Sequence, residues 1–349
     1  MEANGNPNPQ GVIEEAAALL ERARTELARH IVGQTEMIDG LLTALAAGGH
    51  ILLEGVPGLA KTLAVRSLAE ITALQFKRIQ FTPDLLPADI TGTLIWEQNT
   101  GQFTVRRGPV FANVILADEI NRAPAKVQSA LLEAMEERQV TIGETTYPLP
   151  EPFLVLATQN PIEHEGTYAL PEAQLDRFFL KLLVRYPRLD EETRIVEQQA
   201  GGDAEGAFPP LRPVLGPSFR EVLGAAACAV RIDRRITEYL VSVAAATRPP
   251  AHKGPGLGVP RSGEGGRQDR EGLYRYIAFG ASPRASIALY RCCRIRALFE
   301  GRSFVTPGDV KAAAFPVLRH RIVLSYEAEA EGLDADGVIS RILALVPAP

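Results

Sequence analysis

One segment restricts the folds open to this chain more than any other. An apolar strand pattern, Ile51 to Glu54, runs directly into a glycine-rich turn, and a helix pattern follows from Lys61 to Ile71. A strand, a glycine turn and a helix in this order are typical of the first β-α unit of a parallel sheet. The backbone amides of such a turn, together with the positive end of the helix, wrap an anion. The segment therefore predicts an α/β domain with an anion site at the end of its first strand.

The turn matches the phosphate-loop pattern G-x-x-x-x-G-K-[ST] at all positions but one. Its residues are Gly55, Val56, Pro57, Gly58, Leu59, Ala60, Lys61 and Thr62, with Leu63 next in the helix. We expect Lys61 to neutralise the β- and γ-phosphates of a nucleotide, and Thr62 to place its hydroxyl on Mg²⁺. Alanine stands at position 60, where the pattern has glycine. It is tolerated if Ala60 has helical dihedral angles and its methyl group points away from the phosphates. The alternative, a chance glycine-rich turn, is disfavoured by the flanking strand and helix.

A second strand pattern, Asn113 to Ala117, ends in two acids, Asp118 and Glu119. Open α/β sheets bind ligands at the carboxyl ends of their strands. We expect Asp118 to hold Mg²⁺, directly or through water, and Glu119 to orient and deprotonate the attacking water. A third pattern, Phe153 to Thr158, is followed by Asn160, whose amide is expected to position that water. The alternatives are solvated acids at a strand end and a plain Asn-Pro turn.

The remaining patterns divide the chain into a tail (1–10), an α/β domain (11–190), a linker (191–217) and an all-helical domain (218–349). The first domain contains a further strand, Phe76 to Phe81, and a helix, Pro124 to Arg138. It also holds two β-hairpins, Gly92 to Val110 and Val140 to Leu149. No strand pattern follows residue 217, and a glycine- and arginine-rich loop, 254–272, is expected inside the helical domain.

Composition excludes several classes of protein. The 349 residues carry 37 Lys and Arg against 42 Asp and Glu, a net charge of −5, which disfavours constitutive nucleic-acid binding. Three cysteines exclude a disulfide scaffold and favour the cytoplasm. The polar start, Met1 to Gln10, does not look like a signal peptide, and no apolar run reaches the length of a membrane helix.

Five ordered motifs together resemble the MoxR family of AAA+ ATPases, which is related to the magnesium-chelatase motor subunit. The motifs are Gly55 to Thr62, Leu116 to Ala123, Ala157 to Pro161, Leu175 to Phe178 and Gly280 to Arg284. The resemblance covers roughly Ile31 to Leu345. The phosphate loop of this family also has alanine before the lysine. The resemblance implies a P-loop core with β-hairpin inserts and a helical lid, which hydrolyses ATP with Mg²⁺.

The resemblance also implies roles for single residues. Ile31, Val32, Gly33 and Gln34 match the segment beside the adenine, and Asn160 matches the sensor of the γ-phosphate. Arg177 matches the arginine finger that reaches a neighbour's ATP, and Arg284 matches the second sensor on the lid. Arg122 and Arg185 remain competing candidates for the finger. A salt bridge from Arg177 to Asp176 or Glu172 and an ordinary first-turn arginine at position 284 are the alternatives.

The family implies a homo-oligomeric ring, usually hexameric, that acts with a von Willebrand factor A domain protein on a client protein. The hairpins are expected to face the pore or the client. Trp96, in the first hairpin, is expected to be either its packing anchor or a client contact. The rival hypothesis is a nucleic-acid motor of the helicase type. Such a motor would need basic residues on its hairpins. The second hairpin disfavours this hypothesis, because Thr141 to Tyr147 contains Glu144 and no Lys or Arg.

Overall fold

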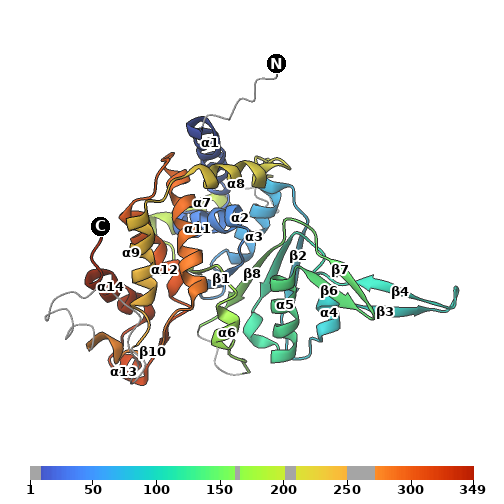
Figure 1. Cartoon of the computed structure of the whole chain (residues 1–349). Coiled ribbons are helices and arrows are strands. Elements are labelled where there is room, and N and C mark those ends of the chain that lie inside the picture. The colour runs from blue at the N-terminus through green and yellow to red at the C-terminus, as the bar shows by residue number, and fades with distance from the viewer. Residues whose placement is uncertain (1–8, 162–165, 201–209, 250–271) are drawn as a thin grey trace, which may run out of the picture. The chain divides into compact units, whose positions relative to one another are not determined.

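The computed structural model describes residues 9–161, 166–200, 210–249 and 272–349 (Figure 1). The chain forms two compact units, one from Leu19 to Arg220 and one from Glu221 to Pro349 that also includes the residues before Leu19. Helix α1 (Pro9–Leu27) therefore spans the division, whereas the sequence-based scheme assigned its residues from position 11 to the α/β domain. The expected tail, 1–10, is two residues too long, because α1 already begins at Pro9. Proline suits the first turn of a helix. Apart from Gly272, the expected loop 254–272 lies outside the described residues.

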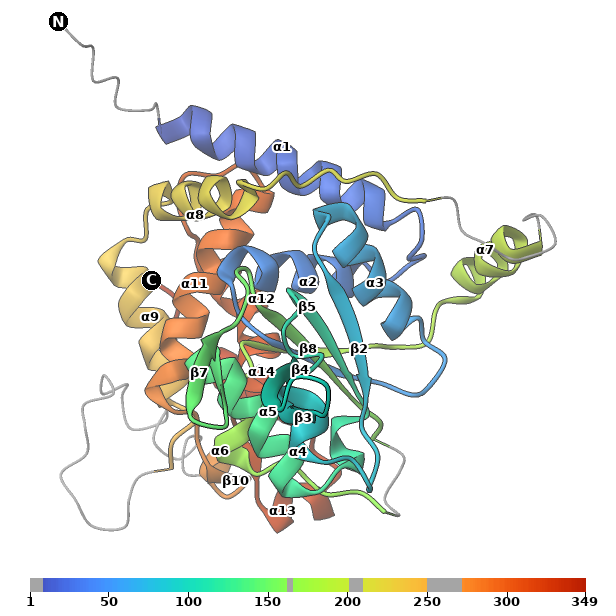
Figure 2. The same cartoon turned by 90° about the vertical axis from the view of Figure 1, so that its right-hand side faces the viewer.

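The first unit is built on a five-stranded sheet in the order β2-β5-β8-β1-β9, and all of its neighbouring strands are parallel. Strand β1 lies between β8 and β9, and β2 is the edge strand nearest the viewer in Figure 2. This confirms the predicted α/β core, although β9 was not foreseen. The strands are β1 (Ile51–Glu54), β2 (Phe76–Gln80), β5 (Val114–Asp118), β8 (Leu154–Gln159) and β9 (Leu180–Leu183).

Apolar side chains cover both faces of this sheet. On one face, Leu52, Ile115 and Val155 pack with Leu131 of α5 in a single buried cluster. Side chains alternate along a strand, so Leu53 points to the other face. On that face, α3 contacts β5 and α2 contacts β9. The helices of this unit are α2 (Thr35–Ala47), α3 (Lys61–Thr72), α4 (Pro87–Thr91), α5 (Ala125–Glu137), α6 (Glu172–Leu175) and α7 (Leu189–Ala200), with the 3₁₀ helix η1 (Ile120–Arg122).

Both predicted hairpins are present. The first pairs β3 (Gly92–Glu97) with β4 (Gln102–Arg107) and extends away from the sheet of its unit (Figure 1), and the second pairs β6 (Gln139–Ile142) with β7 (Thr145–Pro148). Trp96 and Phe103 face each other across the first hairpin, with ring centroids 5.0 Å apart in an edge arrangement. Their exposed fractions are 52% and 65%, so Trp96 anchors the hairpin and still presents its ring to solvent.

The second unit is mainly helical. Its helices are α8 (Phe219–Ala229), which begins at the division, α9 (Arg234–Ala245), α11 (Pro283–Phe299), α12 (Pro307–Leu318), α13 (Tyr326–Ala330) and α14 (Ala335–Leu345). The expectation of no strand after residue 217 is wrong, because β10 (Ile277–Phe279) and β11 (Val323–Leu324) form an antiparallel ribbon. Strands of two or three residues are too short to produce a period-two pattern.

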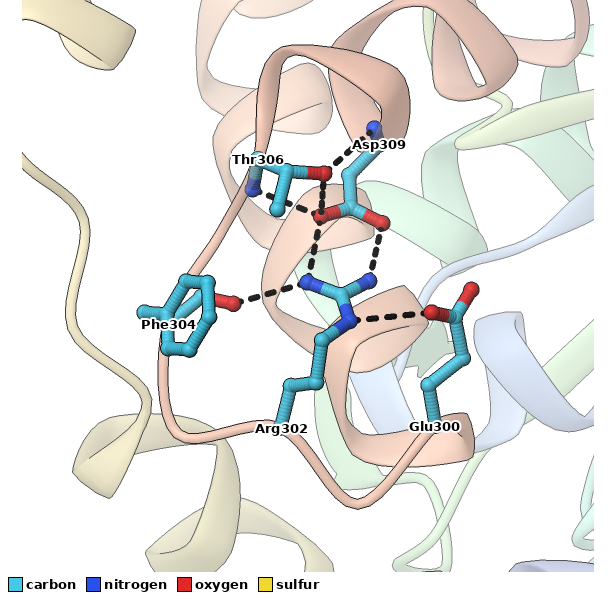
Figure 3. A network of polar contacts seen from close by, with 5 residues as sticks. All are labelled: Glu300, Arg302, Phe304, Thr306 and Asp309. Carbon is cyan, nitrogen blue, oxygen red and sulfur yellow. Dashed lines mark hydrogen bonds and ion pairs between the residues drawn. The ribbon is translucent and has the colours of Figure 1, made fainter.

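A polar network fixes the turn between α11 and α12 (Figure 3). The guanidinium of Arg302 donates to both carboxylate oxygens of Asp309, at 3.0 and 2.7 Å, and to the carboxylate of Glu300 at 2.9 Å. The backbone N–H of Thr306 donates to Asp309 at 2.7 Å, and the Thr306 hydroxyl caps α12. The Asp309 side chain is only 3% exposed, so this carboxylate depends on its donors.

Among the described residues, no helix is both long and apolar enough to cross a membrane.

Candidate functional site

The glycine-rich turn joins strand β1 to helix α3 and surrounds the start of that helix. At Gly55 a side chain has no room, because a Cβ atom would lie 2.6 Å from the carbonyl oxygen of Val184. Gly58 has open space around it but a φ of +85°, which glycine adopts at little cost. Glycine is thus required at the first position by space and at the second by backbone conformation.

Ala60 does not have the helical dihedral angles that the sequence argument required. Its φ is +55° and its ψ is +18°, in the left-handed region immediately before α3. A methyl group in this region contacts the following carbonyl oxygen, which glycine avoids. The phosphate-loop pattern has glycine here for this reason, and the alanine is accommodated with backbone strain.

Lys61 is the first residue of α3 and lies back across the turn. Its Nζ donates to the carbonyl oxygen of Gly55 at 2.5 Å, which joins the two ends of the loop. Thr62 follows on the exposed first turn, and Leu63 is half-buried behind it. The first amides of a helix have no intrahelical acceptor and carry partial positive charge. The loop therefore places an ammonium group, a hydroxyl and helix amides together, a donor set that suits phosphate oxygens.

Asp118 ends the buried strand β5 and is 9% exposed. Its Oδ2 accepts two hydrogen bonds from Arg78 of β2, from Nη2 at 2.6 Å and from Nε at 3.0 Å. Its Oδ1 accepts the hydroxyl proton of Thr158 of β8 at 2.6 Å. Neighbouring strands on both sides thus hold the carboxylate at the carboxyl edge of the sheet.

Glu119 follows in a left-handed conformation, with φ +55° and ψ +51°. This turn directs the chain out of β5 and into η1. The Glu119 carboxylate accepts a hydrogen bond from Gln80 of β2 at 2.9 Å and is paired with Arg122 at 3.0 Å. The side chain of Glu119 is 25% exposed, so it is oriented by its partners and remains accessible to water.

Asn160 directly follows β8, which lies between β5 and β1 in the sheet. Because these strands are parallel, Asn160, the two acids and the glycine-rich turn all leave the sheet at the same edge. Asn160 is 6% exposed. The structure therefore brings together the three strand-end motifs that the sequence placed far apart along the chain.

The segment expected beside an adenine lines a cavity of about 220 Å³. Gly33 has a φ of +76°, and a Cβ atom there would lie 2.2 Å from the carboxyl carbon of Glu191, so only glycine fits. The side chain of Gln34 donates to the carbonyl oxygen of Arg185 at 2.8 Å. The lining residues are Arg24, Ala28, Ile31, Val32, Gly33, Gln34, Thr35, Ile38, Arg194 and Gln198.

The candidate arginines have different surroundings. Arg177 is paired with Glu136 of α5, a partner that the sequence did not suggest, and not with Asp176 or Glu172. Arg122 is paired with Glu119, and the exposed Arg185 follows β9. Arg284 belongs to the other unit, in the first turn of α11, where its backbone N–H donates to the Ser282 hydroxyl at 3.1 Å.

Sequence reasoning missed Arg78 and Gln80, which hold the two acids. A signal was present, because the two residues are spaced by two along a predicted strand and therefore share one face. What the sequence lacked was the pairing of β2 with β5, in which Gln80 is the register partner of Asp118.

The chain is similar to known proteins over most of its length. Residues 50–180 match the profile of the ATPase family associated with various cellular activities (AAA), and residues 274–342 match that of the AAA lid domain. The chain is 46% identical to Chaperone MoxR1 of Mycobacterium tuberculosis over 345 residues, which cover 98% of this chain and 86% of the relative. It is 42% identical over 336 residues to YeaC of Bacillus subtilis, an uncharacterized protein, with 96% and 97% of the two chains covered. A crystal structure from Cytophaga hutchinsonii, described as that of a candidate ATPase, superimposes with a TM-score of 0.83 at 44% identity and covers 97% of both chains.

Proposed function

The chain belongs to the MoxR family of AAA ATPases, and from this premise we propose that it hydrolyses ATP with Mg²⁺ as a ring, most simply a hexamer, that remodels a client protein. Membership confirms the resemblance inferred from the motifs, and with it the ATPase class. The magnesium ion, the ring and the client are the parts that we add.

One observation carries the proposal: the glycine-rich turn, Asp118, Glu119 and Asn160 leave the sheet at one edge. Lys61 and the amides of α3 would hold the β- and γ-phosphates. The Thr62 hydroxyl and the Asp118 carboxylate are hard oxygen ligands of the kind that Mg²⁺ prefers. When bound, Mg²⁺ neutralises charge on the phosphate oxygens.

Glu119 would orient the attacking water and accept its proton, and Asn160 would hold that water toward the γ-phosphate. The contacts from Gln80 and Arg122 support this role, because they fix the direction of the Glu119 carboxylate. Ile31 to Gln34 would receive the adenine in the cavity that they line. Arg177 would act on a neighbour's ATP, and Arg284 would read the nucleotide from the lid.

The proposal is tested by measuring steady-state ATP hydrolysis against Mg²⁺ and protein concentration. We expect activity per subunit to rise with assembly and to require Mg²⁺. Glu119→Gln should lower kcat at least about 100-fold, because general-base catalysis contributes roughly 10²–10⁴. Glu70→Gln, which alters an exposed pair with Arg66, is the matched control and should be unchanged. A well-assembled wild type that binds ATP and does not hydrolyse it would overturn the proposal.

The client role is proposed on the exposed pair Trp96 and Phe103 of the first hairpin. Replacing both with serine should leave basal ATP hydrolysis within about twofold, since the hairpin extends away from the sheet (Figure 1). Binding of a von Willebrand factor A domain partner and of its client would be measured by co-elution with Glu119→Gln in ATP. Salt-sensitive DNA binding would favour the rival nucleic-acid motor. A cytoplasmic location stays part of the proposal.

A further inference from the structure

Thr158 is a buried residue of β8 to which neither the motifs nor the comparisons assign a role. Its residue exposure is 1%, and it lies on the strand between β5 and β1. Its hydroxyl contacts both acids of the site at once. It accepts the backbone N–H of Glu119 at 2.8 Å and donates to Oδ1 of Asp118 at 2.6 Å.

The direction of both hydrogen bonds is determined by chemistry. A backbone N–H can only donate, so the Thr158 oxygen accepts from Glu119 and its own proton remains for the Asp118 carboxylate. A single hydroxyl is therefore the acceptor of one bond and the donor of the other. A side chain without this group would leave a buried carboxylate oxygen and a backbone N–H each short of one partner.

The two bonds fix different properties of the site. Arg78 already holds Oδ2 of Asp118 with two hydrogen bonds, and the bond from Thr158 to Oδ1 prevents rotation of the carboxylate. At Glu119 the bond holds a backbone in the left-handed region, which a residue of this type rarely adopts unless its surroundings enforce it. The direction in which Glu119 leaves the strand depends on that conformation.

We propose that Thr158 is a positioning residue of the hydrolytic site: its hydroxyl sets the orientation of the Asp118 carboxylate and the left-handed turn at Glu119. The expected effect on the rate of ATP hydrolysis rests on the proposed function, because positioning changes that rate only if the two acids act in hydrolysis. A displacement of about 1 Å in such a group can lower a rate by roughly 100-fold. The contact itself is independent of that function.

The test compares Thr158→Val, which keeps the shape and removes the hydroxyl, with Thr158→Ser, which keeps the hydroxyl. Thr158→Ala serves in its place if the valine variant does not fold. Thr72→Val is the matched control, because Thr72 is also buried and its hydroxyl bonds only to carbonyl oxygens of α3. Hydrogen exchange at the Glu119 amide, followed by NMR, reports on the contact without reference to activity.

We expect Thr158→Val to speed exchange at the Glu119 amide at least about tenfold and to lower kcat about 10- to 100-fold, with KM for ATP within about threefold. Thr158→Ser should restore both, and Thr72→Val should change neither. Unchanged exchange at Glu119, a kcat within twofold of wild type, or a serine variant as slow as the valine variant would each overturn the inference. A wild type without hydrolysis would overturn the proposed function instead, and the exchange measurement would still decide whether Thr158 holds the turn.

Discussion

The guanidinium of Arg177 lies 2.7 Å from the carboxylate of Glu136, so the residue proposed as the trans finger is held by helix α5 of its own chain. It also donates to the carbonyl oxygen of Leu132 at 2.8 Å. Both partners of the ion pair are about one-third exposed, with side-chain fractions of 30% and 35%. Pairs with this exposure contribute roughly 0–1 kcal/mol, so release of Arg177 toward a neighbour is energetically inexpensive.

If Arg177 acts in trans, two inactive variants should complement each other. Arg177→Ala lacks the finger and Glu119→Gln lacks the base, so each alone should be at least about 100-fold slower than wild type. Mixed rings contain interfaces in which an intact Glu119 meets an intact Arg177. Random mixing in equal amounts should restore up to about one quarter of wild-type ATP hydrolysis, since one interface in four has both groups.

The double variant Glu119→Gln/Arg177→Ala, mixed with Arg177→Ala, supplies no finger and should stay inactive. Mixtures that assemble into joint rings without any gain in activity would rule out Arg177 as the finger. The same mixing experiment with Arg122→Ala or Arg185→Ala would then identify the residue that acts.

Much of this site could be predicted from the sequence because its signals are local. The lysine and threonine directly follow the turn after β1, and the two acids lie at the end of β5, so each signal is within a few residues of its strand. The left-handed conformation of Ala60 could not be predicted, because the same residue would fit a helical first turn. The partners of the two acids also escaped, because Arg78 and Gln80 reach them only through the pairing of β2 with β5.

Prediction of the fold was also limited to elements with a strong local sequence pattern. Long periodic segments such as α3 and α5 were predicted to within one residue at each end, whereas β9, β10 and β11 were missed. Strands of two to four residues carry little pattern of their own, and they form through pairing with distant segments, β9 with β1 and β10 with β11. The Glu136 partner of Arg177 also depends on tertiary packing, since the two residues are far apart in the sequence.

His50 should make the first unit less stable in mild acid. Burial lowers the pKa of His50 to about 4 from its usual value near 6.5. Its Nδ1 accepts the N–H of Val155 at 3.0 Å, which leaves Nε2 to donate to the carbonyl oxygen of Met135. In the unfolded chain, His50 therefore binds a proton near pH 6.5. In the folded chain, it binds that proton only near pH 4. The contribution of His50 to the free energy of unfolding is therefore complete above pH 6.5. It falls by roughly 3 kcal/mol as the pH is lowered toward 4.

Urea unfolding of the full chain between pH 4 and pH 7.5 measures this effect. His50→Gln retains a donor near Met135 and cannot titrate, so its stability should be lower at pH 7 and should fall less between pH 6.5 and pH 4. A variant whose pH dependence in that window is as steep as that of wild type would assign the effect to other groups.

The network around Arg302 in the second unit predicts a large effect from one substitution. Burial alone would raise the pKa of Asp309, but the hydrogen bonds from Arg302 and Thr306 outweigh it, and the pKa is lowered. The carboxylate is therefore charged while buried. Arg302→Ala should destabilise the protein by about 3 kcal/mol or more, because removal of one partner leaves that charge uncompensated.

Thermal or urea unfolding compares Arg302→Ala with Arg234→Ala. Arg234 pairs with Glu238 at the surface, with side-chain exposures of 90% and 61%, so its loss should cost about 0.5 kcal/mol or less. Because the pKa of Asp309 is lowered in the folded protein, the contribution of the network persists at neutral pH and disappears only below the ordinary pKa of an aspartate. Equal losses in the two variants would show that the buried carboxylate does not need Arg302.

The left-handed conformation of Ala60 gives the last prediction. Ala60→Gly removes a contact that costs about 1–2 kcal/mol in this region, while glycine adds freedom to the unfolded chain worth up to about 1 kcal/mol. We expect the substitution to leave the protein as stable as wild type or more stable by up to about 1 kcal/mol. Ala73→Gly is the positive control, because Ala73 ends α3 at a φ of +51° and should respond in the same way. Ala69→Gly, inside the same helix, should instead destabilise by about 1 kcal/mol or more. Urea unfolding measures all three, and a loss at position 60 as large as that at position 69 would mean that Ala60 does not occupy the left-handed region in solution.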